Sequence, residues 1–179
     1  MTKNSQKLQL KLRQSYGKQL LPKFLDDLSK SLNRPKESIS LLDLEQTNYL
    51  VEAYKNRAKL QLENDEFTFK RIWPANEIEL ARKFINCLRE RMPIRQMFLF
   101  RSLSEYCGAV RIDIRDLLQN AFQLIGLDQE HIVAWSDDGA FSIVFGHYED
   151  WTEIGSEITF ELRLRGKEWL LMANDVLVE

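Results

Sequence analysis

Residues 157–165 alternate strictly between polar and apolar side chains, and this segment limits the possible folds more than any other. Such alternation is the pattern of a β-strand with one buried and one exposed face. Upstream, an Asp-Gly pair at 138–139 lies between the apolar runs 131–135 and 141–148. An Asp-Gly pair between two such runs predicts a hairpin. The C-terminal part of the chain is therefore predicted to be an antiparallel β-meander.

The N-terminal half favours helices, and the middle mixes helices and strands. We expect helices over residues 6–32 (broken near Gly17 or Pro22), 43–60, 76–92, 114–125 and 167–174, and further strands over 67–73, 95–100 and 107–112. Asn76 and Glu79 form a capping-box pattern at the start of one helix, and Gly126 is placed as the C-cap of another. The predicted fold class is α+β, with the helices packed on one face of the sheet.

The chain is predicted to be a single domain of residues 1–179, because its length suits one well-buried core and it has no Pro/Gly/Ser-rich linker. The clearest break is at residues 33–36. It divides a basic helical arm, residues 1–34, from an α+β body, residues 35–179.

Composition limits the cellular compartment that we expect for the protein. Two cysteines, Cys87 and Cys107, cannot form a disulfide framework and suit a reducing compartment. Apolar runs such as 97–100 are too short to span a bilayer, and the N-terminus lacks the apolar segment of a secretory signal. We therefore expect a cytoplasmic protein without a membrane partner.

Charge is distributed unevenly along the chain, although the formal net charge is only −2. Between residues 121 and 162 there is no Lys or Arg, and there are nine carboxylates: Asp128, Glu130, Asp137, Asp138, Glu149, Asp150, Glu153, Glu157 and Glu161. A surface of one sign attracts an oppositely charged partner. The simpler interpretation is a solvated sheet face with its loops.

Motifs for catalysis are missing from the sequence. There is no G-x-x-x-x-G-K-[ST] and no G-x-G-x-x-G phosphate-binding pattern. His131 and His147 could approach each other across the predicted hairpin and bind a metal with Asp128 or Glu149, or they could simply lie at strand ends. No metal-binding spacing supports the first option, so we expect no catalytic residues, metal or cofactor.

Aromatic residues interleave with the acidic segment, as they do in protein interfaces that combine buried anchors with electrostatic steering. The predicted partner-binding residues are Asp137, Asp138, Tyr148, Glu149, Asp150, Trp151 and Glu153. Their partner is expected to be a basic protein.

The basic N-terminus is a competing feature, because the first 25 residues hold six basic and no acidic side chains. The alternative nucleic-acid-binding residues are Lys3, Lys7, Lys11, Arg13 and Lys18. The first three recur every four residues and so share one helical face, which suits contacts to phosphates. Otherwise they form a polar outer face, or are neutralised by the acidic segment of the same or a neighbouring chain.

The segments 135–139 and 149–153, in a single α+β domain without a catalytic set, resemble the small cytoplasmic immunity proteins of bacterial toxin systems, including those of contact-dependent growth inhibition. The resemblance concerns character and covers residues 121–165. It implies a non-enzymatic protein that masks the active site of a cognate toxin, often a basic nuclease, with carboxylates. Our hypothesis is therefore an immunity-type binding protein. The alternative is a nucleic-acid-binding or regulatory module that uses the basic N-terminal helix.

Overall fold

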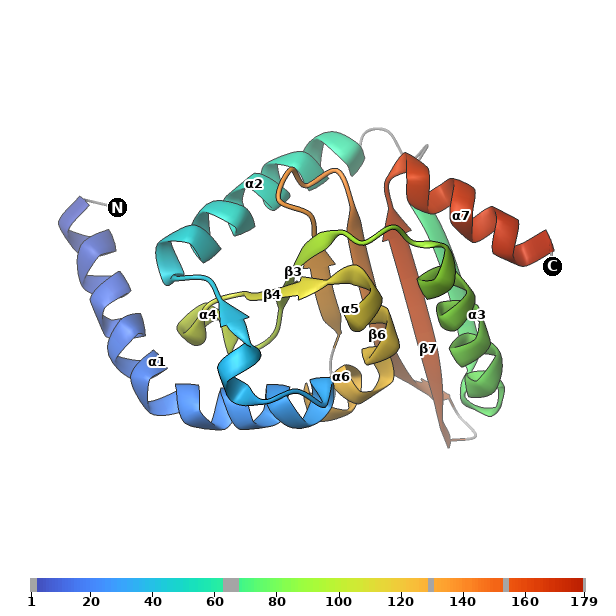
Figure 1. The fold of residues 1–179 in the computed structure, drawn as a ribbon, viewed down its shortest axis with the longest axis horizontal. Coiled ribbons are helices and arrows are strands. Elements are labelled where there is room, and N and C mark those ends of the chain that lie inside the picture. The colour runs from blue at the N-terminus through green and yellow to red at the C-terminus, as the bar shows by residue number, and fades with distance from the viewer. Residues whose placement is uncertain (1–2, 63–67, 129–130, 153–154, 179) are drawn as a thin grey trace.

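The computed structural model describes residues 3–62, 68–128, 131–152 and 155–178 (Figure 1). The helices are α1 (Lys3–Leu32), α2 (Leu44–Leu62), α3 (Ile78–Arg91), α4 (Ser104–Cys107), α5 (Ile114–Gln119), α6 (Ala121–Asp128) and α7 (Lys167–Val178). The strands are β1 (Ser40–Leu41), β2 (Thr68–Pro74), β3 (Gln96–Phe100), β4 (Val110–Asp113), β5 (Ile132–Trp135), β6 (Ser142–Thr152) and β7 (Gly155–Arg165). Short 3-10 turns cover Lys36–Ser38 and Ala75–Glu77.

The described strands form a seven-stranded sheet in the order β1-β4-β3-β5-β6-β7-β2. Every neighbouring pair is antiparallel. The α+β class and the C-terminal meander β5-β6-β7 are therefore confirmed. The Asp-Gly pair lies in the β5–β6 turn, where Gly139 has a φ of 64°, a conformation that glycine adopts without strain.

The main core lies between one face of the sheet and the helices α1, α3, α5, α6 and α7. Its fully buried side chains include Leu28 of α1, Trp73 of β2, Leu88 of α3 and Trp169 of α7. These residues follow the apolar periodicity of their elements, because the apolar stripe of a helix is the part that packs on a sheet.

Helix α2 departs from the expected one-face arrangement, since it packs on the opposite face of the sheet. Tyr54 of α2 stacks on Trp135 with ring centroids 4.2 Å apart, and Trp135 stacks on Phe100 of β3 at 3.6 Å. The alternating side chains of β3 and β5 are apolar on both faces here, so this end of the sheet is covered on both sides. We call the face on the α2 side the outer face.

Helix α1 runs unbroken through both positions where a break was expected. Pro22 lies inside the helix, and Figure 1 shows that α1 bends near its middle. A proline inside a helix removes one backbone hydrogen bond and bends the axis, and packing on both sides can hold the helix together. The second half of α1 contributes Phe24, Leu28 and Leu32 to the core.

Two predicted helix boundaries are wrong. Asn76 lies in a 3-10 turn, and α3 starts at Ile78 without a side-chain cap. The helix expected over 114–125 is split at Asn120, whose side-chain amide donates to the Asp116 carbonyl at 2.8 Å, and Gly126 lies inside α6. Asparagine side chains bond to nearby backbone groups in this way, and they are therefore more favourable at helix ends than inside helices.

Candidate interaction surface

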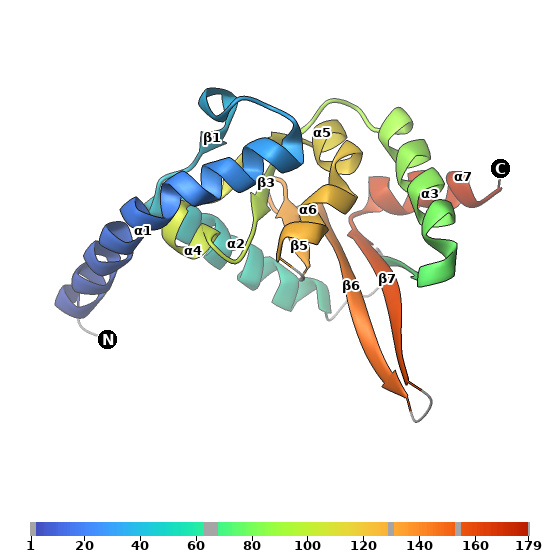
Figure 2. The same cartoon turned by 90° about the horizontal axis from the view of Figure 1, so that it is seen from below.

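Strands β6 and β7 form a hairpin that projects beyond the helices (Figure 2). They pair along their whole length, from Ser142 opposite Arg165 to Thr152 opposite Gly155. Strand β5 pairs with β6 only at residues 142–145, and β2 pairs with β7 only at residues 159–165. Beyond these neighbours the sheet is reduced to a two-stranded ribbon, residues 146–152 and 155–158, which we call the acidic arm.

The acidic arm carries negative charge without any lysine or arginine. Its described backbone includes Glu149, Asp150 and Glu157. Asp150 and Glu157 are direct partners in the register of the two strands. Like charges at directly opposite positions destabilise an antiparallel pair.

The structure separates the predicted partner-binding residues into two groups. Residues 148–151 belong to the acidic arm, while Glu153 and the side chains of 148–151 lie outside the described part of the structure. Asp137 and Asp138 lie in the β5–β6 turn, at the opposite end of β6. Because an eleven-residue strand spans about 33 Å, the turn and the arm are not parts of one contact patch.

The two turn carboxylates have local structural partners. Asp138 Oδ1 accepts hydrogen bonds from Ser136 Oγ at 2.5 Å and from the Ala140 N–H at 2.9 Å. Asp137 Oδ1 accepts from the Asp138 N–H at 2.8 Å. Such side-chain to backbone bonds are how aspartates stabilise turns. The pattern Asp-Asp-Gly is therefore explained by turn formation.

Glu161, at the base of the arm, is paired within the chain. It is 7% exposed on the outer face, contacts Arg163 Nε, and lies 3.2 Å from Lys70 Nζ. Burial raises the pKa of Glu161, but hydrogen bonds and positive charge from Arg163 and Lys70 outweigh that effect, and the pKa lies below its ordinary value. Sequence reasoning counted Glu161 as uncompensated because Lys70 is distant along the chain.

The outer face of the sheet around Glu161 is consequently basic. Lys70 of β2 lies opposite Arg163 of β7, and Thr68 lies opposite Arg165. Lys70 and Arg163 are like charges at opposite positions, and Glu161 pairs with both of them. At this end of the β6–β7 hairpin the unpaired acidic residues therefore lie in the arm beyond this cluster, a division that the summed charge of residues 121–162 did not reveal.

The basic residues of α1 have different environments. Lys7, Lys11 and Lys18 are exposed, whereas Arg13 is turned inward and the side chain of Lys3 lies outside the described part. Arg13 donates from Nε and Nη2 to the Glu105 carbonyl, and from Nη1 to Asn48 Oδ1 at 3.0 Å. Arg13 thus links α1 to α4 and α2.

A cleft of about 1000 Å³ lies between the N-terminal half of α1, helix α2 and the β3–α4 loop. Its charged lining residues are Lys7, Arg13, Lys55, Arg101, Glu45, Glu52 and Glu105. Arg101 is only 8% exposed, and Lys55 Nζ lies 3.2 Å from Glu52. Sequence reasoning did not find this cleft, because its walls come from three segments. Its balanced charges do not favour a ligand of either sign.

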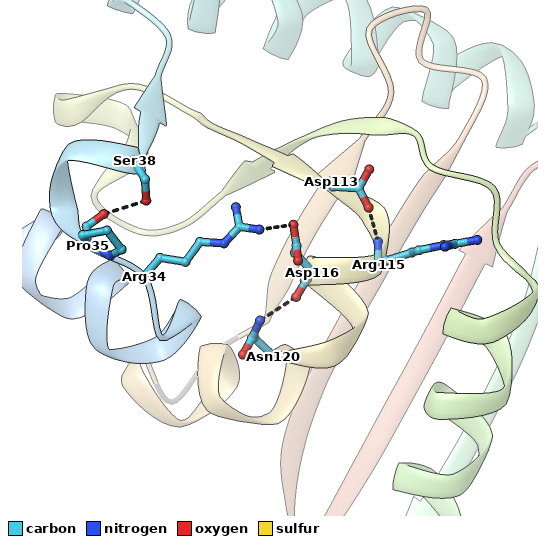
Figure 3. Close-up of polar contacts among 7 residues, drawn as sticks. All are labelled: Arg34, Pro35, Ser38, Asp113, Arg115, Asp116 and Asn120. Carbon is cyan, nitrogen blue, oxygen red and sulfur yellow. Dashed lines mark hydrogen bonds and ion pairs between the residues drawn. The ribbon is translucent and has the colours of Figure 1, made fainter.

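Polar contacts also fix the end of α1 against α5 (Figure 3). Arg34 Nη2 lies 2.5 Å from Asp116 Oδ2, which connects the chain after α1 to α5. Asp113 Oδ1 accepts from the Arg115 N–H at 2.8 Å and so caps α5. Arg115 Nε donates to the Met92 carbonyl at 2.7 Å, which joins α5 to the end of α3. This junction holds the second half of α1 in place.

The two histidines have different neighbours, and the side chains of Asp128 and Glu149, considered as ligands with them, lie outside the described part of the structure. His131 lies over Gly146, where a Cβ atom would approach the imidazole Cγ to 2.9 Å. His147 is the next residue along β6, and its ring centroid is 6.4 Å from that of Phe160. Within the described ranges, no group of three histidine, cysteine or acidic side chains is placed to hold a metal ion, and no helix is long and apolar enough to cross a bilayer.

Comparison with known proteins gives no further guidance, since no family model, curated protein or solved structure matches this chain.

Proposed function

We propose that this chain is a non-enzymatic binding protein that captures a basic partner protein with its acidic arm. One observation carries the proposal. The arm projects from the body, its described part contains three acidic residues and no lysine or arginine, and its register sets Asp150 opposite Glu157. Lysine or arginine side chains of a partner would relieve the repulsion between these two positions.

The mechanism is stoichiometric and electrostatic. A protruding acidic ribbon steers a basic partner during encounter, and this steering weakens as salt screens it over a Debye length of about 10 Å at 0.1 M. The backbone edges of the ribbon, outside its pairing with β5 and β2, offer further hydrogen-bonding groups to a partner.

The partner chemistry that fits best is a phosphate-binding basic surface, such as that of a nuclease-type toxin domain. Side chains that hold a nucleic-acid backbone are lysines and arginines, and carboxylates compete for them directly. A protein that occupied such a surface would act as an immunity protein, in agreement with the resemblance noted in the sequence.

The test is affinity capture from a lysate of the cells that make the protein. The arm variant carries Glu149→Lys, Asp150→Lys and Glu157→Lys. A control variant with Glu37→Lys, Glu90→Lys and Asp175→Lys changes the net charge equally at exposed positions elsewhere. We expect wild type and control to retain a basic protein in a 1:1 complex and the arm variant to lose it. Equal retention by all three proteins would exclude the arm as the site.

Nucleic-acid binding through α1 is the second candidate, and the exposure of Lys7, Lys11 and Lys18 supports it. If these three side chains contact phosphates, the logarithm of affinity for a random DNA duplex should fall with the logarithm of salt with a slope of about −2.7. Fluorescence anisotropy with a labelled duplex measures this slope. Replacing the three lysines with glutamine should abolish binding, and binding that survives would assign it to another surface.

A further inference from the structure

The first half of α1 has an apolar stripe that the described part of the chain leaves more than half exposed. Leu8, Leu12 and Tyr16 are 60%, 53% and 60% exposed, and Tyr16 is in contact at its edge with Tyr106 of α4, at a ring-centroid distance of 6.3 Å. They recur every four residues and therefore lie along one face of the helix. Scattered exposed leucines are ordinary on protein surfaces, but an aligned set on one helix is the pattern of a face that docks on a partner.

Positive charge flanks this stripe. Lys7 and Lys11 each precede a stripe leucine by one residue, and both are exposed. Within the first 25 residues there is no acidic side chain, although Lys7 also lines the cleft that contains Glu45, Glu52 and Glu105. The surface that complements this part of α1 must therefore combine carboxylates with apolar groups.

The acidic arm has that combination. Glu149, Asp150 and Glu157 belong to it, and Ile158, at its base, is 45% exposed. The first half of α1 and the arm lie far apart in both views (Figures 1 and 2). They therefore do not meet within one chain, and neutralisation of the arm by its own N-terminal helix is excluded by the fold.

We propose that the first half of α1 docks on the acidic arm of a second copy of this chain, head to tail. The contact joins two different surfaces, so it is either made twice, reciprocally, in a closed dimer, or continues around a ring or along a chain of subunits. Two like-charged α1 helices would repel each other in a symmetric pair. The proposal shares the arm with the proposed function but concerns a different partner, so the second copy and a basic partner compete for it.

Sedimentation velocity on the full chain tests this arrangement. The average mass should rise between ~1 and ~100 µM protein, as mass action requires, and the rise should vanish at high salt. A head variant carries Lys7→Gln, Lys11→Gln and Leu12→Ser. A tail variant carries Glu149→Gln, Asp150→Asn and Glu157→Gln. Each alone should stay monomeric.

An equimolar mixture of the two variants provides the decisive result. The intact arm of the head variant and the intact α1 of the tail variant should form one contact, so the mixture should give a dimer that does not grow further. Because misfolded variants could not restore association, this result also controls for folding. A mixture of folded variants that stays monomeric, or a wild type that stays monomeric throughout, overturns the proposal.

Other occupants of the α1 face give different outcomes. Association that the head variant loses and the mixture does not restore would indicate symmetric α1 pairing. A monomeric wild type that binds anionic lipid vesicles through α1 would assign the face to a membrane surface. Both results contradict the head-to-tail contact. Capture of a basic partner by the head variant, whose arm is intact, tests the proposed function separately.

Discussion

At the scale of single residues, Glu161 shows that a carboxylate that looks unpaired in the sequence can be ion-paired in the fold. In the sequence it is one of the nine carboxylates of residues 121–162, a stretch that contains no lysine or arginine, and Arg163 follows two positions later. In the fold it is buried between Lys70 and Arg163. The sequence could not predict this ion-paired cluster, because the pairing of β2 with β7 joins segments about 90 residues apart.

Replacing Glu161 with glutamine should lower the free energy of unfolding at pH 7 by about 1–2 kcal/mol, because charge-assisted hydrogen bonds are lost. The pKa of Glu161 is lowered in the folded state, so its contribution is complete above the unfolded value near 4.5 and is lost as the pH falls through the lower folded value. Urea unfolding of both proteins across this pH range measures the difference.

The matched control for that experiment is Glu79→Gln. Glu79 is 78% exposed and lies 3.6 Å from Arg82, one turn along α3. Exposed pairs of this kind contribute about 0.5 kcal/mol or less. A Glu161→Gln effect no larger than the control, or one that does not shrink in acid, would contradict the structural role of the cluster.

At the scale of elements, the sequence predicts what local patterns determine and misses what packing determines. The alternation over residues 157–165 and the Asp-Gly pair correctly predict β6, β7 and the turn before β6. Neither pattern indicates how far β5 pairs along β6 or how far β2 pairs along β7. The ends of these pairings decide where the sheet narrows to the arm. The continuation of α1 past Pro22 likewise depends on tertiary contacts.

At Gly17 the close packing of α1 against α4 outweighs the low helix propensity of glycine. A Cβ atom at Gly17 would overlap the Tyr106 carbonyl oxygen of α4, whereas a Cβ at Gly126 in α6 meets nothing within 4 Å. Gly126→Ala should therefore stabilise the protein by about 0.5–1 kcal/mol, the ordinary gain from alanine inside a helix.

Gly17→Ala should have the opposite sign and destabilise the protein by more than about 1 kcal/mol, because the backbone of α1 must move away from α4. Thermal unfolding followed by circular dichroism compares the two variants with wild type. If Gly17→Ala stabilised the protein as much as Gly126→Ala, the close contact between α1 and α4 would be wrong.

At the scale of the whole molecule, opposite charges are far apart, with a basic first half of α1 and an acidic arm that projects from the body (Figure 2). The sequence correctly indicated that the charges are segregated. It grouped Asp137 and Asp138 with residues 148–153, although β6 places its turn and the arm at opposite ends of one strand. Charge counted along a chain does not give its position in space, because each strand reverses direction.

The measurement that tests the central claim most directly is the association rate constant of the purified basic partner with three forms of this protein. These are wild type, the arm variant and the control variant of equal net charge, each measured at about 0.05 and 0.5 M salt. We expect wild type and control to associate rapidly at low salt, and at least tenfold more slowly at high salt, with the arm variant slow at both. Equal rates for the arm variant and the control would contradict the proposal that the acidic arm captures the partner.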